Sequence, residues 1–299
     1  MIKKFIYLIV TIALMASCHS GGSQKSGGEF GENDSLSGDS ALPVSKEAME
    51  NLVQNISSPV EIASLIKSIG VPFSQKYLAP TKIDNFNTAN SKAFNLGIMA
   101  TDLGYLNIYS KTSLVLQYIT SIKSLADGIS IGQFFDFTTL KRLATNNENI
   151  DSLMYISIHS FNVMDDYMRK HKRGNLSTLM VAGGYIEGLY IITQVAKEHP
   201  NKDINDYIGG QKTILNELML ILKNYQKDPY FAQLITEMET IKKVLEPVKI
   251  TIEKGEPKSV ERNGMLYIEQ NTKSIITITD EQLKSIIAQT EIVRNKLIK

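Results

Sequence analysis

Two isolated acids lie inside apolar, helix-like segments of the sequence. Glu187 lies within AGGYIEGLYIITQ and Asp102 within NLGIMATDLGYLNIYSKT, and each is followed three residues later by a tyrosine, Tyr190 or Tyr105. Moving a carboxylate from water into a helical core costs several kcal/mol unless it has a partner. Each acid is therefore expected to be hydrogen-bonded, protonated, paired with a base, or at the wall of a water-filled cleft.

Glycines accompany both acids. Gly183, Gly184 and Gly188 surround Glu187, while Gly97 and Gly104 belong to a small-residue stripe near Asp102. A glycine inside a helix costs about 1 kcal/mol relative to alanine, so these glycines require a packing reason. Small residues four apart let another backbone approach closely. We therefore expect two closely packed helices with the acids sheltered nearby.

Two interpretations of these acids remain open. The favoured one is structural, with Asp102 and Glu187 bonded to tyrosine hydroxyls, helix termini or a lysine in the core. The other is a pocket between the two helices, with Asp102, Tyr105, Glu187, Tyr190 and His159 as its polar residues. Such a pocket would suit a small organic or cationic ligand. The repeated acid–tyrosine spacing also allows a worn internal duplication.

His159 offers the other candidate chemistry. It shares a helical face with Tyr155, Asn162 and Asp166, so a metal ion or a general base is conceivable there. However, the sequence lacks the Glu-x-x-His pair of di-iron bundles and the His-Glu-x-x-His motif. It also lacks a Gly-x-Ser-x-Gly elbow and a phosphate-binding glycine loop. No catalytic residue, metal ligand or cofactor is assigned.

The charges that follow His159 resemble an ordinary helix end. Asp165 and Asp166 have Arg169 and Lys170 four residues on, the spacing of surface ion pairs. The basic run at residues 169–173 lies at a predicted helix C-terminus, where cations favour the helix dipole. Binding of anionic head groups or glycans by this run is the lesser interpretation.

Apolar residues at spacings of three and four predict a succession of amphipathic helices. Ser58 is a predicted N-cap, Gly174 is predicted to end one helix, and Thr279 with Gln282 forms a capping box for the last. The predicted helices cover about residues 58–70, 88–110, 111–127, 138–145, 149–173, 177–198, 204–226, 229–245 and 279–297.

The segment before the last helix has the period-two alternation of strands. VKITIE and SIITIT alternate, and Asn263-Gly264 between two short strand-like runs is a type I′ hairpin signal. The alternative is an extended, loosely paired excursion. The predicted fold class is mainly α: a multi-helix bundle of antiparallel helical hairpins with a small C-terminal antiparallel β-meander of three or so strands and a final helix.

The first residues, MIKKFIYLIVTIALMASC, have the layout of a secretory signal peptide. Lys3 and Lys4 precede an apolar core at residues 5–16 that is shorter than the roughly 20 residues of a spanning helix. Small residues then lead into Cys18, the only cysteine in the chain. The alternative is an ordinary signal peptide with an incidental cysteine.

This junction resembles the lipobox of bacterial lipoprotein precursors, with Met15 at the usual leucine position. The resemblance implies cleavage before Cys18, lipidation of its thiol with palmitate-type chains and acylation of the new amino terminus. Two or three acyl chains hold a protein firmly on a bilayer. His19 is not the aspartate that retains some lipoproteins at the inner membrane, which favours the outer membrane.

Four regions follow from these patterns. Residues 1–17 are the predicted signal peptide and residues 18–43 a Gly/Ser-rich tether, too polar to fold. Residues 44–247 are the predicted helical body, and residues 248–299 the hairpin or meander with the last helix packed on the body. The formal net charge of +1 predicts no affinity for nucleic acid.

The body resembles uncharacterised helical lipoproteins of Bacteroidetes-type bacteria, on the segments around Asp102 and Glu187 quoted above. That resemblance implies no activity. We expect a lipid-anchored binding or scaffolding module of the cell envelope, on its periplasmic or surface face, that meets an envelope protein, a glycan or a small ligand. The alternative is an envelope enzyme that uses Asp102, Glu187 and His159 for acid–base or metal chemistry.

Overall fold

The structure, a computed structural model, describes residues 59–145, 150–255, 258–262, 265–269 and 272–298, together with residues 47 and 52. The chain divides into two compact units, residues 1–39 and 40–299, and every described residue belongs to the second. The predictions for the signal peptide, Cys18, the tether, Ser58 and the Asn263-Gly264 turn fall outside the described residues.

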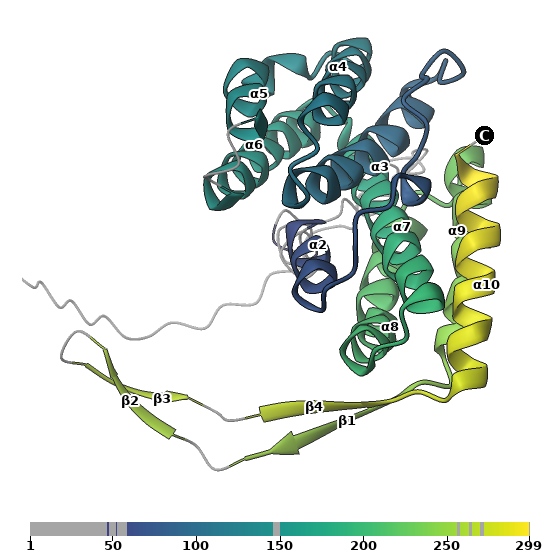
Figure 1. Cartoon of the computed structure of the whole chain (residues 1–299). Helices are drawn as coiled ribbons and strands as arrows, with labels where there is room; N and C mark the ends of the chain where they lie inside the picture. Colours follow the sequence, from purple (N-terminus) through teal and green to yellow (C-terminus); the bar gives the residue numbers. More distant parts are fainter. Residues whose placement is uncertain are drawn as a thin grey trace, which may run out of the picture. The chain divides into compact units, whose positions relative to one another are not determined.

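Helices make up most of this unit, which confirms the predicted mainly α class (Figure 1). Two short 3₁₀ turns, η1 (Gln75–Tyr77) and η2 (Gly132–Phe134), lie in the loops. The described helices are α2 (Pro59–Ser68), α3 (Ala89–Ile108), α4 (Thr112–Gly128), α5 (Phe137–Thr145), α6 (Ile150–Lys170), α7 (Gly174–Glu198), α8 (Lys202–Lys223), α9 (Pro229–Leu245) and α10 (Asp280–Leu297).

Local signals explain most helix boundaries. Thr279 and Gln282 form the predicted capping box of α10, which satisfies backbone N–H groups that have no partner inside the helix. One boundary prediction is wrong: Gly174 does not end α6 but opens α7. The chain turns between the two helices at Lys172, whose φ of 59° is the left-handed conformation usual at a helix C-terminus.

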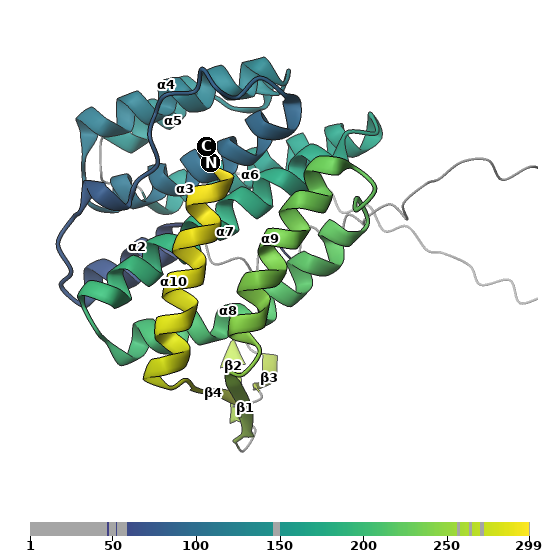
Figure 2. The same cartoon turned by 90° about the vertical axis from the view of Figure 1, so that its right-hand side faces the viewer.

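Helix α7 is the central helix of the body. It contacts α2, α3, α6, α8 and α10, as Figures 1 and 2 show from two sides. Among the described residues, α7 is the one helix long and apolar enough to cross a membrane by length and composition, but 94% of its most apolar window is buried inside the protein. It therefore serves as the core helix of the body, around which the others pack.

Glycines line the seam between α3 and α7, as predicted for Gly97 and Gly183. A Cβ atom on Gly97 would lie 1.9 Å from the backbone oxygen of Met180, and one on Gly183 would lie 2.0 Å from that of Phe94. Gly188 instead faces α2, where its Cβ would lie 2.8 Å from Ile62 Cδ1. The two helix backbones thus approach more closely than any side chain at positions 97 and 183 would allow.

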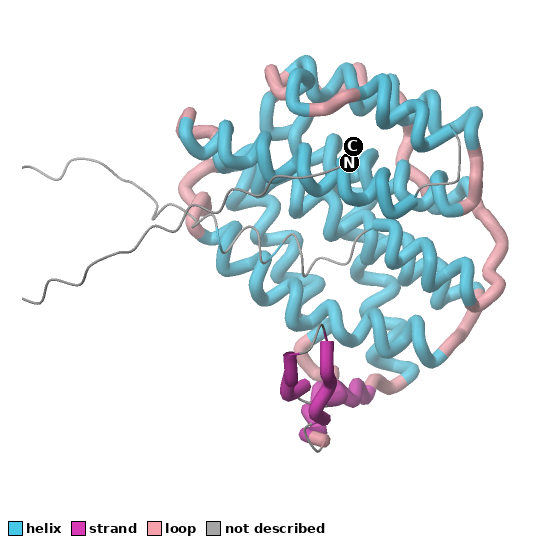
Figure 3. Tube along the Cα trace, turned by 90° about the vertical axis from the view of Figure 1, so that its left-hand side faces the viewer, coloured by secondary structure: helices cyan, strands magenta, loops and turns pink. Residues whose placement is uncertain are grey.

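The four described strands form a nested antiparallel ribbon (Figure 3). Strand β1 (Lys249–Lys254) pairs with β4 (Thr272–Thr277), and β2 (Lys258–Arg262) pairs with β3 (Met265–Glu269). A meander would pair each strand with the next, so this pairing differs from the predicted order. Alternation specifies which segments are strands but not which strands pair with one another. The described pairs place the β2–β3 pair between the two strands of the β1–β4 pair along the chain.

Candidate functional site

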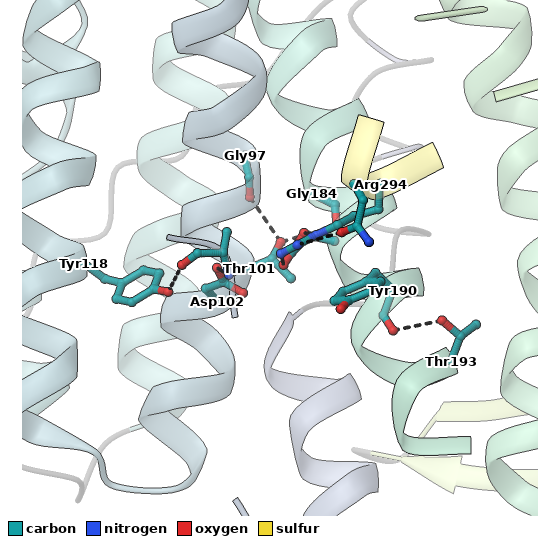
Figure 4. Close-up of polar contacts among 11 residues, drawn as sticks. Gly97, Thr101, Asp102, Tyr118, Gly184, Tyr190, Thr193 and Arg294 are labelled. Atoms are coloured by element: carbon teal, nitrogen blue, oxygen red, sulfur yellow. Dashed lines mark hydrogen bonds and ion pairs between the residues drawn. The ribbon is translucent and has the colours of Figure 1, made fainter. Parts of the chain in front are cut away.

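Three helices bring charged side chains together beside the glycine seam (Figure 4). Asp102 comes from α3, Glu187 from α7 and Arg294 from α10, and their side chains are almost wholly buried, with Asp102 and Glu187 both 0% exposed. Arg294 Nη2 donates to Glu187 Oε1 at 2.6 Å, and its Nε donates to Glu187 Oε2 at 2.8 Å. This is a bidentate, charge-assisted pair that uses both oxygens of the carboxylate.

Tyr190 completes the environment of the cation. The carbon at the centre of the Arg294 guanidinium lies 4.3 Å from the centroid of the Tyr190 ring, which is within the range of a cation–π contact. Tyr190 lies three residues after Glu187 on α7, so one helix supplies both the anion and the ring. Glu187 and Tyr190, three residues apart on α7, therefore together bind the side chain of an arginine from α10.

Asp102 is held from the opposite side by a loop. Its Oδ2 accepts a hydrogen bond of 2.9 Å from the backbone N–H of Ala79. The hydroxyl of Tyr118, from α4, donates in turn to the carbonyl of Ala79. Next to Asp102 on α3, Thr101 donates to the carbonyls of Gly97 and Gly184 at 3.2 and 3.3 Å, which ties α3 to α7 at the seam.

Burial and the neighbouring charge act on both carboxyls. Burial, followed by the charge of Glu187, raises the pKa of Asp102 well above its ordinary value, although the Ala79 N–H opposes this. Burial also raises the pKa of Glu187, while the hydrogen bonds and charge of Arg294 lower it. The arrangement therefore favours an ionised Glu187 and a protonated Asp102.

Tyr105 has a different environment from the one expected. Its hydroxyl accepts a hydrogen bond of 3.0 Å from the backbone N–H of Ser74. Its ring packs against Phe73 and Tyr109, with centroid separations of 5.6 and 5.0 Å. Tyr105 thus anchors the segment after α2, whereas Tyr190 contacts the acid's partner, so the two acid–tyrosine pairs have unlike surroundings.

His159 is exposed on α6, and its ring stacks on that of Tyr155, which is itself 70% exposed. It does not face the two fully buried carboxyls, so the expectation that it joins them in one pocket is corrected. The predicted ion pairs that follow it are confirmed, with Arg169 bonding Asp165 at 2.7 Å and Lys170 bonding Asp166 at 2.6 Å. In the described part of the chain, no group of three or more His, Cys, Asp or Glu side chains is arranged to hold a metal ion.

Two surface hollows lie outside this charged cluster. One, of about 410 Å³, lies between the start of α8 and strand β4. The other, of about 340 Å³, is lined by residues 75 and 78–82 and by Leu114, Gln117 and Tyr118 of α4. Asp102, Tyr105, Glu187 and Tyr190 line neither hollow. Ala79 and Tyr118, however, line the second hollow; Ala79 donates to Asp102, and Tyr118 donates to Ala79.

The sequence analysis missed Arg294, although the sequence carries a signal for it. Arg294 continues the apolar face of α10 at helical spacing, and a charged residue on a buried face needs a buried partner of opposite sign. The acids at 102 and 187 were the isolated anions available to it. The buried residues of that face are Leu283, Ile286, Ile287, Thr290, Val293 and Arg294.

Comparison with known proteins gives no family assignment. The chain matches no protein-family model, and neither a curated protein nor a solved structure is detectably similar to it.

Proposed function

We propose that this chain is a lipid-anchored protein of the cell envelope, attached through Cys18 on the outer membrane, whose helical body binds or scaffolds a partner. The partner classes are an envelope protein, a glycan or a small ligand. The lipobox-like junction at Cys18 and the Gly/Ser-rich tether after it support the anchor. The tether, some 25 residues of Gly-rich coil, spans roughly 30 Å and would hold the body clear of the lipid head groups.

One observation carries the preference for binding over catalysis. Asp102 and Glu187 have no exposed surface, and both oxygens of Glu187 bond to Arg294. A general acid or base must reach its substrate directly or through one water. The acids most suited to chemistry by type therefore stabilise the packing of α3, α7 and α10.

The alternative is an envelope enzyme that uses Asp102, Glu187 and His159. That chemistry requires the three groups at one open site, whereas His159 is exposed on α6 and the two acids are buried. The enzyme alternative is thus the less well supported of the two.

The anchor is tested by lipid labelling in bacterial cells. Cells that express the full chain are fed an alkyne analogue of palmitate, and a Cys18→Ser variant is the matched control. We expect label on the wild-type chain, its recovery in the outer-membrane fraction, and loss of both in the variant. Equal labelling of the two chains would contradict the anchor.

Binding by the body is tested separately from the anchor. Residues 40–299 form one compact unit, so this part can be purified without its lipid and mixed with washed cell envelopes. We expect saturable binding that sediments with the envelopes and that the Asp102→Asn variant retains. Absence of saturable binding would contradict the binding module. Loss of binding in a variant of unchanged stability would favour a chemical role for Asp102.

A further inference from the structure

The charges of the buried cluster do not balance if Asp102, Glu187 and Arg294 are all ionised. Arg294 supplies one positive charge to two carboxyl groups, and both carboxyls have zero exposed surface. An uncompensated charge in such a site is strongly destabilising. Because Glu187 binds Arg294 through both oxygens, Glu187 is the ionised acid and Asp102 is the one that carries a proton.

The hydrogen bonds around Asp102 agree with that assignment. Its Oδ2 accepts from the Ala79 N–H, while Oδ1 is buried and has no hydrogen-bond partner among the described residues. Oδ1 is therefore the oxygen free to carry the proton, and Glu187 is the charged group that acts most strongly on Asp102. The other ionisable groups that act on Asp102 are Arg294 of α10 and Tyr118 of α4. Burial raises the pKa of Tyr118, so its hydroxyl stays protonated.

The segment that bonds Asp102 also lines a surface hollow on the α4 side. Residues 78–82 have no helical or strand structure, and they line the hollow of about 340 Å³ together with Tyr118. Two bonds from α4 hold this segment down: the Tyr118 hydroxyl to the Ala79 carbonyl, and Ser121 Oγ to the Thr81 carbonyl at 2.9 Å. We define residues 78–82 as the cover segment.

We propose that the cover segment is a proton-controlled lid: the proton on Asp102 keeps it closed, and loss of that proton opens it to water from the hollow. When Asp102 is ionised, it places a second negative charge beside Glu187. Contact with water stabilises this second charge. Water reaches Asp102 by displacing Ala79 from Asp102 and from Tyr118. Opening therefore releases the proton, and higher pH favours the open state.

Hydrogen exchange at the Ala79 amide tests this lid in the full chain, because that N–H is the one bonded to Asp102. For ordinary opening, the exchange rate rises tenfold per pH unit through base catalysis. Where opening also releases a proton, we expect about a 100-fold rise per pH unit, since the open population itself grows tenfold. In the Asp102→Asn variant, whose amide can accept from Ala79 and donate to Glu187, we expect the tenfold slope.

Two comparisons make the outcome decisive. The Ala79 amide should exchange faster than core amides of α7 such as that of Ile186. Equal exchange rates would mean that the proton is released only when the whole protein unfolds, which would overturn the lid. A tenfold slope at Ala79 in the wild type would show that Asp102 carries no releasable proton and would also overturn it. Tyr118→Phe should raise the Ala79 exchange rate about tenfold at every pH while leaving the steep slope intact. It removes one bond from the cover segment, and burial keeps the Tyr118 hydroxyl protonated, so no group that titrates near neutral pH is lost.

Discussion

Charge balance determines which replacements each member of the buried cluster tolerates. Arg294 and Glu187 satisfy one another, so removing either leaves an unpaired buried charge, whereas removing both leaves none. Asp102 differs because its protonated form is nearly reproduced by asparagine. The sequence could predict that both acids would be buried and partnered, since their apolar, glycine-rich surroundings exclude water. It could not predict Arg294 as the partner, because Arg294 lies 107 residues further along the chain than Glu187.

The Glu187→Gln variant tests the pair. We expect the free energy of unfolding to fall by about 3–5 kcal/mol, because the Arg294 guanidinium is left buried without its counter-charge. Adding Arg294→Met should recover most of that loss, since an apolar side chain of similar length then fills the site. Chemical denaturation of the single and double variants measures both changes.

A matched control comes from an exposed pair on the same two helices. Lys197 Nζ lies 3.0 Å from Glu291 Oε2, with both side chains more than a third exposed. Glu291→Gln should therefore cost less than about 1 kcal/mol. If Glu187→Gln costs no more than this control, Glu187 is not an ionised partner of Arg294.

Helix α7 is apolar on nearly every face because neighbours surround it, and its glycines mark where a neighbouring backbone comes closest. The sequence predicted the α3–α7 seam because glycine in a helix interior is costly without such contact. It predicted most helix boundaries for a similar local reason, since caps act within one turn. The turn at Lys172 was missed because a left-handed lysine has no sequence signal, while the nearby Gly174 has a strong one.

Alanine substitution at two neighbouring glycines tests the seam. Gly97→Ala places a methyl group 1.9 Å from the Met180 backbone oxygen, which must force the helices apart. We expect a loss of about 1–3 kcal/mol or more in the free energy of unfolding. Gly184→Ala is the control, because its nearest contact, Thr101 Oγ1, is 3.4 Å away.

The control should leave stability unchanged or raise it by up to about 1 kcal/mol, through the better helix propensity of alanine. Thermal unfolding of both variants by circular dichroism measures the difference. Similar effects at the two positions would mean that backbone approach does not determine this interface.

For the whole molecule, proton linkage connects the buried cluster to overall stability. In the unfolded chain Asp102 titrates near its ordinary pKa of 3.8, whereas in the folded protein burial and Glu187 raise that pKa well above this value. Between the two values the folded state holds one more proton than the unfolded state. The contribution of Asp102 to stability is therefore fully present below the unfolded pKa and is lost as pH rises toward the folded pKa.

The difference in unfolding free energy between the wild type and Asp102→Asn isolates this contribution, because all other titrating groups are common to both. As pH rises from about 5 to about 8, the wild type should lose stability relative to the variant by up to about 1.4 kcal/mol per pH unit. Urea denaturation at each pH measures the slope. A difference that stays constant would mean that Asp102 and Glu187 are both ionised in the folded protein.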